Sequence, residues 1–262
     1  MATEEKKTSY ISILIKAFSI LDYMNDEGCE CGISNISKAT GIPKANVFRI
    51  VKTLEHLGII EIKNEGYVLG RGLLKYAKQS SENNELVDLS GKYLKNLAKE
   101  VGETINLGIV YENNVLILSS EFGESTSLVS KLLPICPLYS SSMGKLFLSE
   151  QDDENIKSYF DNVEAEKMTV NTIVTYEDFM KEKEKIHKKG ISYDYEEYEY
   201  GLTCISSGIR NKNGKMIAAV SLSGPTTRLH FKGLEKLEEK ISSLAETISA
   251  DVCEFLEEDF EV

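Results

Sequence analysis

The 262-residue sequence contains no apolar run that approaches the roughly 18 residues of a membrane-spanning helix. The first ten residues, MATEEKKTSY, also lack the apolar core of a secretory signal peptide. Only five cysteines are present, and they lack the spacing of a disulfide framework, which indicates free thiols in a reducing compartment. These deficits predict a cytoplasmic protein and argue against the membrane and disulfide-stabilised secreted classes.

The motifs of common enzymes are missing as well, since there is neither a P-loop nor a GxGxxG fingerprint. Cys204 could act as a nucleophile only with a nearby base, and none of the three histidines lies in a recognisable partner motif. The dense acidic run of residues 194–199 is predicted to be a solvated segment and not a carboxylate pair for glycoside hydrolysis. The single Cys29-Glu30-Cys31 motif has no matching second pair, so no zinc site is predicted. We therefore expect no catalytic residue, no metal and no cofactor.

The charge is unevenly distributed along the chain. The whole sequence has a net charge of −12, but residues 1–80 carry +2 and residues 81–262 carry −14. An acidic body repels DNA and would confine contact with DNA to a neutral or basic face. The composition, with 42% hydrophobic and 27% charged residues, is that of a globular protein large enough for two modest domains. The asymmetry supports two domains with different roles.

The N-terminal part begins with two predicted helices. The first extends from about residue 9 to residue 25 and has an apolar stripe along one side. The stripe consists of Ile13, Leu14, Ala17, Phe18, Leu21 and Met24. A short second helix is predicted over Ser34–Ala39, with Ser34 as its N-cap, and Gly41 then breaks the chain.

A third helix and a hairpin follow. Pro43 suits the first turn of a helix that extends to Leu57, and Gly58 suits the position after its end. Two extended stretches then flank a turn that contains Asn64 and Gly66, which predicts a β-hairpin. Helices followed by a hairpin are typical of a winged helix-turn-helix, which we predict over residues 33–70 within a domain of residues 9–70.

The third helix is predicted to read double-stranded DNA. Its outward side, which includes Arg49 and Lys52, carries no acidic residue, and the first turns of such a helix contact base edges in the major groove. Arg49 suits guanine and Asn46 suits adenine, with Lys44 as a third base reader, whereas Lys52 and Lys63 suit phosphates. The alternative is a merely solvated charged face. The predicted DNA-binding residues are Lys44, Ala45, Asn46, Arg49, Lys52 and Lys63.

The rest of the chain has the pattern of an α+β domain. A helical pattern that becomes polar (SSENNE) indicates a linker over residues 71–85, followed by a second domain over residues 86–262. Strand-like runs then alternate with amphipathic helices, and Asn213-Gly214 between two such runs is a strong hairpin signal. We therefore expect an antiparallel sheet with helices packed on it.

Five stretches of the sequence, taken together, have the pattern of a known family. In order, they are ISKATGIPKANVFRIVKTLEHLGII, GYVLGRGLL, SSSMGKLFLS, ISYDYEEYEYGLTC and AAVSLSGP. With these stretches the chain resembles the IclR family of bacterial transcription regulators. The resemblance implies a winged helix-turn-helix, a linker helix used in dimerisation, and a C-terminal GAF-like domain that binds a small effector. It also implies a dimer, or a dimer of dimers, on palindromic operator DNA.

The resemblance also implies an effector site. Its positions in this sequence are Ser142, Asp194, Leu202, Cys204, Ser221 and Ser223. The residue types suit such a site, because Ser221 and Ser223 share one face of a strand and Asp194 can accept a hydrogen bond. The three serines at 140–142 precede an apolar helix, whose N-terminus is a ready site for an anion. A small hydroxy- or keto-acid from sugar or aromatic metabolism is therefore the expected effector.

The sequence thus predicts a ligand-responsive transcription regulator, expected to repress a catabolic operon. The effector would shift the spacing of the paired winged helices, since a ligand shifts an equilibrium only by its differential affinity for two states. Two recognition helices must lie near multiples of about 34 Å along the duplex to engage both half-sites. Two alternatives stay open: an enzyme domain tethered to DNA, and a constitutive DNA-binding dimer without an effector.

Overall fold

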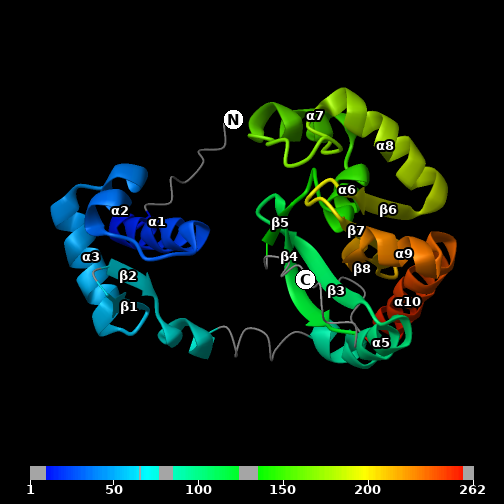
Figure 1. Ribbon diagram of the computed structural model, residues 1–262, viewed down its shortest axis with the longest axis horizontal. Helices are drawn as coiled ribbons and strands as arrows, with labels where there is room; N and C mark the ends of the chain where they lie inside the picture. Colours follow the sequence, from blue (N-terminus) through cyan, green and yellow to red (C-terminus); the bar gives the residue numbers. More distant parts are fainter. Residues whose placement is uncertain (1–9, 65, 77–84, 124–134, 256–262) are drawn as a thin grey trace, which may run out of the picture. The chain divides into compact units, whose positions relative to one another are not determined.

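The protein is described by a computed structural model that covers residues 10–64, 66–76, 85–123 and 135–255. The chain divides into two compact units, residues 1–83 and residues 84–262, and each is described by itself (Figure 1). Among the helices of the described residues, none is long and apolar enough to cross a membrane.

In the smaller unit, helices are followed by a two-stranded antiparallel hairpin, as predicted. Its elements are α1 (Ser12–Glu27), α2 (Ile33–Thr40), α3 (Lys44–His56), β1 (Ile60–Lys63), β2 (Gly66–Leu69) and the 3-10 helix η1 (Arg71–Leu73). Gly41 has a φ of 69°, and this left-handed conformation separates α2 from α3. The hairpin pairs Lys63 with Gly66 at the turn. The predicted order of a winged helix-turn-helix is confirmed.

The start of α2 differs from the prediction. The helix begins at Ile33, and the carbonyl of Gly32 accepts hydrogen bonds from the backbone N–H groups of Asn35 (3.0 Å) and Ile36 (3.1 Å). Ser34 therefore lies inside the helix and is exposed, so its prediction as the N-cap is wrong. The physical reason is that Ile33 packs against the core of this unit, which draws it into the first helical turn.

The apolar stripe of α1 is only partly buried. Ile20 and Met24 lie in the core with α2 and α3, but Ile13, Leu14 and Phe18 are more than half exposed. The predicted helix is confirmed, but the neighbouring core covers only the second half of its apolar stripe.

Part of the predicted linker helix is outside the described residues. Within residues 71–85, the structure describes residues 71–76, which include η1, and residue 85. The next helix begins at residue 85. Residues 77–84 lie outside the described residues, so the linker helix stays a prediction.

The larger unit combines one sheet with helices on both of its faces. Its strands are β3 (Thr104–Tyr111), β4 (Asn114–Glu121), β5 (Ile135–Pro137), β6 (Ile191–Tyr195), β7 (Leu202–Arg210) and β8 (Met216–Pro225). Its helices are α5 (Glu85–Val101), α6 (Ser142–Ser149), α7 (Asp153–Asn162), α8 (Tyr176–Lys189), α9 (Thr226–Lys232) and α10 (Leu234–Phe255). The strands pair antiparallel in the order β5-β4-β3-β8-β7-β6. The α+β prediction is confirmed.

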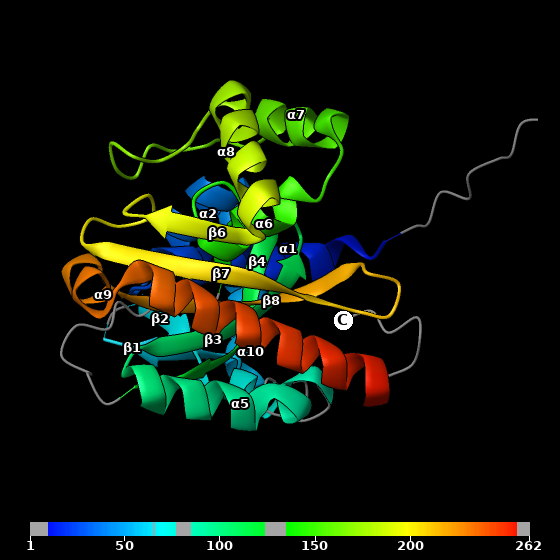
Figure 2. The ribbon, with the colours of Figure 1, turned by 90° about the vertical axis from the view of Figure 1, so that its right-hand side faces the viewer.

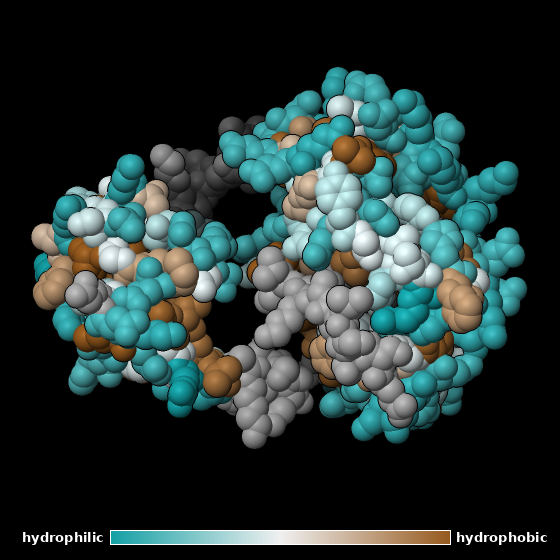
Figure 3. Space-filling view, viewed as in Figure 1, coloured by the Kyte–Doolittle hydropathy of each residue, from teal (hydrophilic) through white to brown (hydrophobic). Residues whose placement is uncertain are grey.

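The two faces of this sheet have different partners. Helices α5 and α10 lie side by side on one face, and α6 with α8 lies on the other (Figure 2). The first face holds a large apolar core that includes Ile105, Leu107 and Ile205. The second face is apolar at one end, where Val115 and Met143 pack, and polar at the other. The outer surface of the unit in Figure 3 is mostly hydrophilic, which fits its acidic composition.

Candidate DNA-contacting helix and small-molecule site

The outward side of α3 is exposed in its first turns. Exposed side chains there are Lys44, Ala45, Arg49 and Lys52. Asn46 is half-buried, because it lies next to the side that packs on α1 and α2. That packing side consists of Val47, Ile50, Val51 and Leu54. The predicted base readers therefore lie on the solvent side of the helix, with Asn46 at its edge.

The outward side is not free of acid, contrary to the prediction. The ammonium group of Lys52 lies 2.6 Å from a carboxylate oxygen of Glu55, one helical turn along. An exposed ion pair of this kind contributes little to stability, so a phosphate can replace Glu55 at little cost. Lys63 is exposed at the end of β1. Phe48 is not among the predicted DNA-binding residues, but its side chain is half exposed on α3.

The predicted effector residues gather on the second face of the sheet in the larger unit. Antiparallel pairing places Asp194 opposite Cys204, and Cys204 opposite Ser223. Ser221 lies two residues from Ser223 on the same strand and is paired with Ser206. All of these side chains are buried. Residues from three strands thus form one continuous polar patch.

Ser142 and Leu202 join the same patch. Ser142 is the first residue of α6, and its hydroxyl is 2.6 Å from the hydroxyl of Ser206 on β7. Leu202 is two residues from Cys204 on β7, so both side chains face the same way. The N-cap of α6 is Ser141, whose hydroxyl accepts a hydrogen bond from the N–H of Gly144 at 3.1 Å. The structure therefore brings all six predicted positions together.

Asn106 is a central residue of this patch that the sequence analysis missed. Its side-chain nitrogen donates hydrogen bonds to the hydroxyls of Ser221 and Ser223, each at 3.2 Å. Its carbonyl oxygen accepts one from Ser120 at 2.8 Å. The sequence pattern that could have identified Asn106 is the alternation in β3, where polar or small residues alternate with Ile105 and Leu107.

The direction of these bonds determines what the patch can offer a ligand. A serine hydroxyl has one proton and two lone pairs. Since Ser221 and Ser223 both accept from Asn106, each has its own O–H group to donate, and that of Ser223 is also within hydrogen-bonding reach of the Cys204 sulfur. The patch therefore presents hydroxyl donors, which suit the acceptor oxygens of a carboxylate or a carbonyl group.

Asp194 is almost fully buried beside these donors. Burial raises the pKa of its carboxyl group to about 7, although hydrogen bonds from the backbone N–H groups of Glu197 and Tyr198 oppose the shift. The negative charge of Glu197 raises this pKa further, and the positive charge of Lys145 lowers it. Burial also raises the pKa of the Cys204 thiol well above its usual value, with the charge of Asp194 adding to the effect. Cys204 is therefore a neutral thiol and not an activated nucleophile.

A buried cation lies next to Asp194. Lys145 of α6 is completely buried, and its ammonium group contacts the carboxylate of Glu197 and, at 3.4 Å, that of Glu182. The prediction of a solvated acidic run is therefore wrong for Asp194 and Glu197, because Lys145 stabilises the charge of Glu197 in the interior. The sequence feature that could have indicated this buried ion pair is the single lysine among the apolar residues of α6.

Some buried polar atoms at this site lack a protein partner. The hydroxyls of Ser140 and Ser192, and one carboxylate oxygen of Glu197, make no hydrogen bond within the described residues. Ser192 is paired with Ser206 across the sheet, so its hydroxyl belongs to the same patch. Buried groups without a partner are rare in folded proteins, and water or a ligand commonly satisfies them.

The two cysteines of the CxC motif have different surroundings. Cys29 is exposed and Cys31 is buried against Tyr67, with both backbone bonds of that pair at 2.9 Å. In the described parts of the chain, no group of three or more histidine, cysteine or acidic residues could hold a metal ion.

Comparison with known families gives two matches. Residues 78–250 match the model described as "Bacterial transcriptional regulator IclR C-terminal", and residues 14–62 match the "IclR helix-turn-helix domain". The first match alone covers more than half of the chain.

Individual proteins give the same result. The HTH-type transcriptional regulator KdgR of Escherichia coli K12 is 28% identical over 251 residues, which is 95% of each chain. The HTH-type transcriptional repressor AllR of Salmonella typhi is 27% identical, over 82% of this chain and 80% of AllR. The crystal structure of Thermotoga maritima IclR has a TM-score of 0.68 at 28% identity and covers 93% of this chain and 99% of its own.

One solved structure contains a bound ligand. It is an IclR homolog from Microbacterium hydrocarbonoxydans in complex with 4-hydroxybenzoate, with a TM-score of 0.74 and 21% identity. The match covers 92% of this chain and 98% of that chain, and at this identity it shows the shared fold.

Proposed function

Because the chain belongs to the IclR family of bacterial transcriptional regulators, we propose that its two units divide operator recognition from effector sensing. The protein is a DNA-binding transcription regulator and not an enzyme. In this proposal, residues 9–70 bind DNA, residues 71–85 link the units, and residues 86–262 sense the effector and form the oligomer. Like AllR, which is a transcriptional repressor, it would repress its target genes in the cytoplasm.

The DNA contacts follow from the exposed side of α3. Lys44 and Arg49 are exposed for hydrogen bonds with bases, and Asn46 reaches bases from the edge of the same surface. Ala45 lets the helix approach closely. Lys52 and Lys63 bind phosphates, with Lys52 exchanging Glu55 for the DNA backbone. A homodimer, or a dimer of dimers, would then engage a palindromic operator.

The effector is a small organic acid or a sugar-derived metabolite with at least one acceptor group. The observation that carries this proposal is the pair of bonds from Asn106, which leaves Ser221 and Ser223 as donors. The hydroxyl of Ser142 and the unpaired hydroxyl of Ser192 extend the same surface. The ligand of the Microbacterium homolog, 4-hydroxybenzoate, has a carboxylate of the required kind.

The enzyme alternative has no support in the geometry of Cys204. Its thiol is buried, and the charge of Asp194 disfavours the thiolate. The two histidines of the larger unit have other partners, since His187 bonds to the carbonyl of Ser149 and His230 to Tyr195. A constitutive dimer without an effector stays as an outcome of the test below.

The test is release of the protein from its own promoter fragment by a panel of hydroxy-, keto- and aromatic acids. We expect one class of acid to release the wild-type protein and the Ser221→Ala, Ser223→Ala variant to need about tenfold or more of it, because two donors are lost. Ser243→Ala removes an exposed hydroxyl of α10 and serves as the matched control. Release that is equal in all three proteins would overturn the assigned site, and no release by any acid would favour the constitutive dimer.

A further inference from the structure

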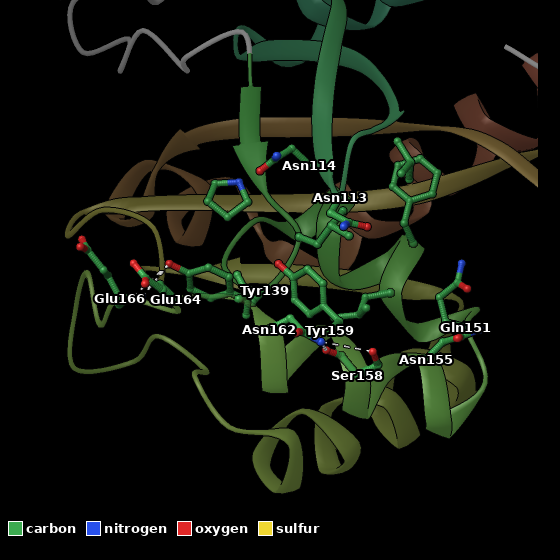
Figure 4. Close-up of a pocket in the computed structure, with 16 residues that line it drawn as sticks. Asn113, Asn114, Tyr139, Gln151, Asn155, Ser158, Tyr159, Asn162, Glu164 and Glu166 are labelled. Atoms are coloured by element: carbon green, nitrogen blue, oxygen red, sulfur yellow. Dashed lines mark hydrogen bonds between the residues drawn. The ribbon is translucent and has the colours of Figure 1, made fainter. Parts of the chain in front are cut away.

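A groove on the larger unit lies apart from the effector patch. Its volume is about 960 Å³, and it is lined by the turn between β3 and β4, the end of β5 and the segment that follows it, the end of α6, and α7 with the residues after it (Figure 4). None of the six predicted effector residues lines it. The volume falls at the upper end of the range of about 300–1,000 Å³ that is typical of small-molecule sites.

Two tyrosines form the centre of this groove. The rings of Tyr139 and Tyr159 lie side by side in Figure 4, between the turn at Asn113 and helix α7. The hydroxyl of Tyr139 donates to the carbonyl of Glu166 (3.2 Å) and accepts from its N–H group (3.1 Å), which holds the ring in place. Burial raises the pKa of Tyr159 to about 12, so this hydroxyl stays neutral at physiological pH. The groove thus offers the uncharged, half-buried ring of Tyr159, with the buried ring of Tyr139 beside it.

The polar residues around the tyrosines are mainly amides. They are Asn113, Asn114, Gln151, Asn155 and Asn162. Asn114, Asn155 and Asn162 each use the side-chain nitrogen for a local bond, to Glu112, Asp152 and Ser158 respectively. Their carbonyl oxygens are then left as acceptors. The groove therefore suits a ligand with many donor groups.

The charge of the lining excludes one class of ligand. Among the described residues that line the groove there is no lysine, arginine or histidine, whereas Glu164 and Glu166 are present. An anion would meet these two carboxylates without a compensating cation from the described lining. This is the opposite of the effector patch, where hydroxyl donors lie near the buried Lys145. The two sites therefore select different ligands.

We propose that this groove is a second small-molecule site and that it binds a neutral carbohydrate. The hydroxyls of a sugar are donors for the amide carbonyls, and the apolar face of a sugar ring packs on the half-buried ring of Tyr159. The site is independent of the effector patch, so a sugar and an organic acid can bind the protein at the same time.

The test is isothermal titration calorimetry of the full chain with neutral mono- and disaccharides, with glucuronate and glucosamine as charged probes. We expect heat of binding with at least one neutral sugar at millimolar concentrations, and binding of glucuronate that is about tenfold weaker or absent. The double variant Gln151→Ala, Asn162→Ala should bind the neutral sugar about tenfold more weakly, because it lacks two exposed amides of the groove.

Two controls separate this site from others. Asn96→Ala removes an exposed amide of α5, outside the groove, and Ser221→Ala alters only the effector patch, so both should bind the sugar as the wild type does. The proposal is overturned if no neutral sugar binds, if Ser221→Ala abolishes the binding, or if the amide variant binds as the wild type does. Tighter binding of glucosamine than of any neutral sugar would also overturn it and assign the groove to cations.

Discussion

Arg49 and Lys52 lie one turn apart on α3, but their expected roles differ. Within the described residues Arg49 forms no ion pair with an acidic side chain, and it can form a bidentate bond to guanine, so Arg49→Ala should weaken specific binding by about 1–3 kcal/mol. Lys52 contacts Glu55 in the free protein, so Lys52→Ala should weaken binding to all sequences similarly and lower the salt slope by about one. Gel shifts over a series of salt concentrations and operator variants measure both effects.

Each variant has an outcome that contradicts its assigned role. If Arg49→Ala leaves both affinity and base preference unchanged, Arg49 does not read a base. If Lys52→Ala changes the preference among operator variants, Lys52 is not merely a phosphate contact. Glu55→Gln is a further control variant, because it removes the ion pair with Lys52 and keeps the lysine. It should strengthen binding to DNA slightly.

Asp194 makes effector binding depend on pH. Its pKa is raised to about 7 by burial, and an anionic effector nearby favours the protonated carboxyl group still more. Binding then takes up a proton, so affinity is full below pH 7 and falls as the pH rises through that value. Between pH 6 and pH 8 we expect the Kd of a carboxylate effector, measured by calorimetry, to rise about tenfold.

The control for this effect is Asp194→Asn. The asparagine oxygen can still accept the hydrogen bonds that Asp194 receives from Glu197 (2.8 Å) and Tyr198 (3.2 Å), so the local backbone should be retained. This variant should bind the same effector with a Kd that is nearly independent of pH. A wild-type Kd that is constant from pH 6 to pH 8 would rule out the linkage to Asp194.

At the scale of elements, the start of α6 depends on one glycine. A Cβ atom at Gly144 would overlap the backbone of Leu138, so the helix and the segment before it approach as closely as only glycine allows. We expect Gly144→Ala to lower the free energy of unfolding by about 1–3 kcal/mol through overpacking. It should also weaken effector binding, because Ser142 and Lys145 move with α6. Urea denaturation and calorimetry measure the two effects.

Helix α5 supplies the matched control for this substitution. Gly91 is also inside a helix, but a Cβ atom there would meet no other atom within 4 Å. Gly91→Ala should therefore stabilise the protein by about 0.5–1 kcal/mol, as alanine does in place of glycine in a helix. Equal effects of the two substitutions on stability would contradict the close contact at Gly144.

At the scale of the whole molecule, operator and effector must influence each other equally. If the effector lowers the affinity for DNA by a given factor, saturating operator lowers the affinity for the effector by the same factor, with a coupling of about 1–3 kcal/mol. Calorimetric titration of the effector with and without bound operator DNA measures it. Effector binding that is unchanged by DNA would contradict a coupled two-domain switch.

Local patterns were sufficient to predict most elements. The third predicted helix, which extends to Leu57, agrees within one residue with α3 (Lys44–His56), and Gly214, with a φ of 75°, confirms the predicted turn between β7 and β8. Turn residues and hydrophobic periodicity act within a few residues of sequence, so they are readable without the fold. Periodicity placed Ile13 and Leu14 on an apolar side of a helix, but it does not say whether anything covers that side, and both residues are more than half exposed.

The sequence by itself determined the winged helix-turn-helix, the α+β class and the membership of a regulator family, because these follow from local pattern and motif order. Only the tertiary structure decided which polar groups share the interior. Asn106 and Ser221 are more than a hundred residues apart and meet through antiparallel pairing, and Lys145 of α6 meets Glu197 in the segment after β6. Burial and hydrogen-bond direction depend on such distant neighbours, and they give the effector patch its donors and Asp194 its raised pKa.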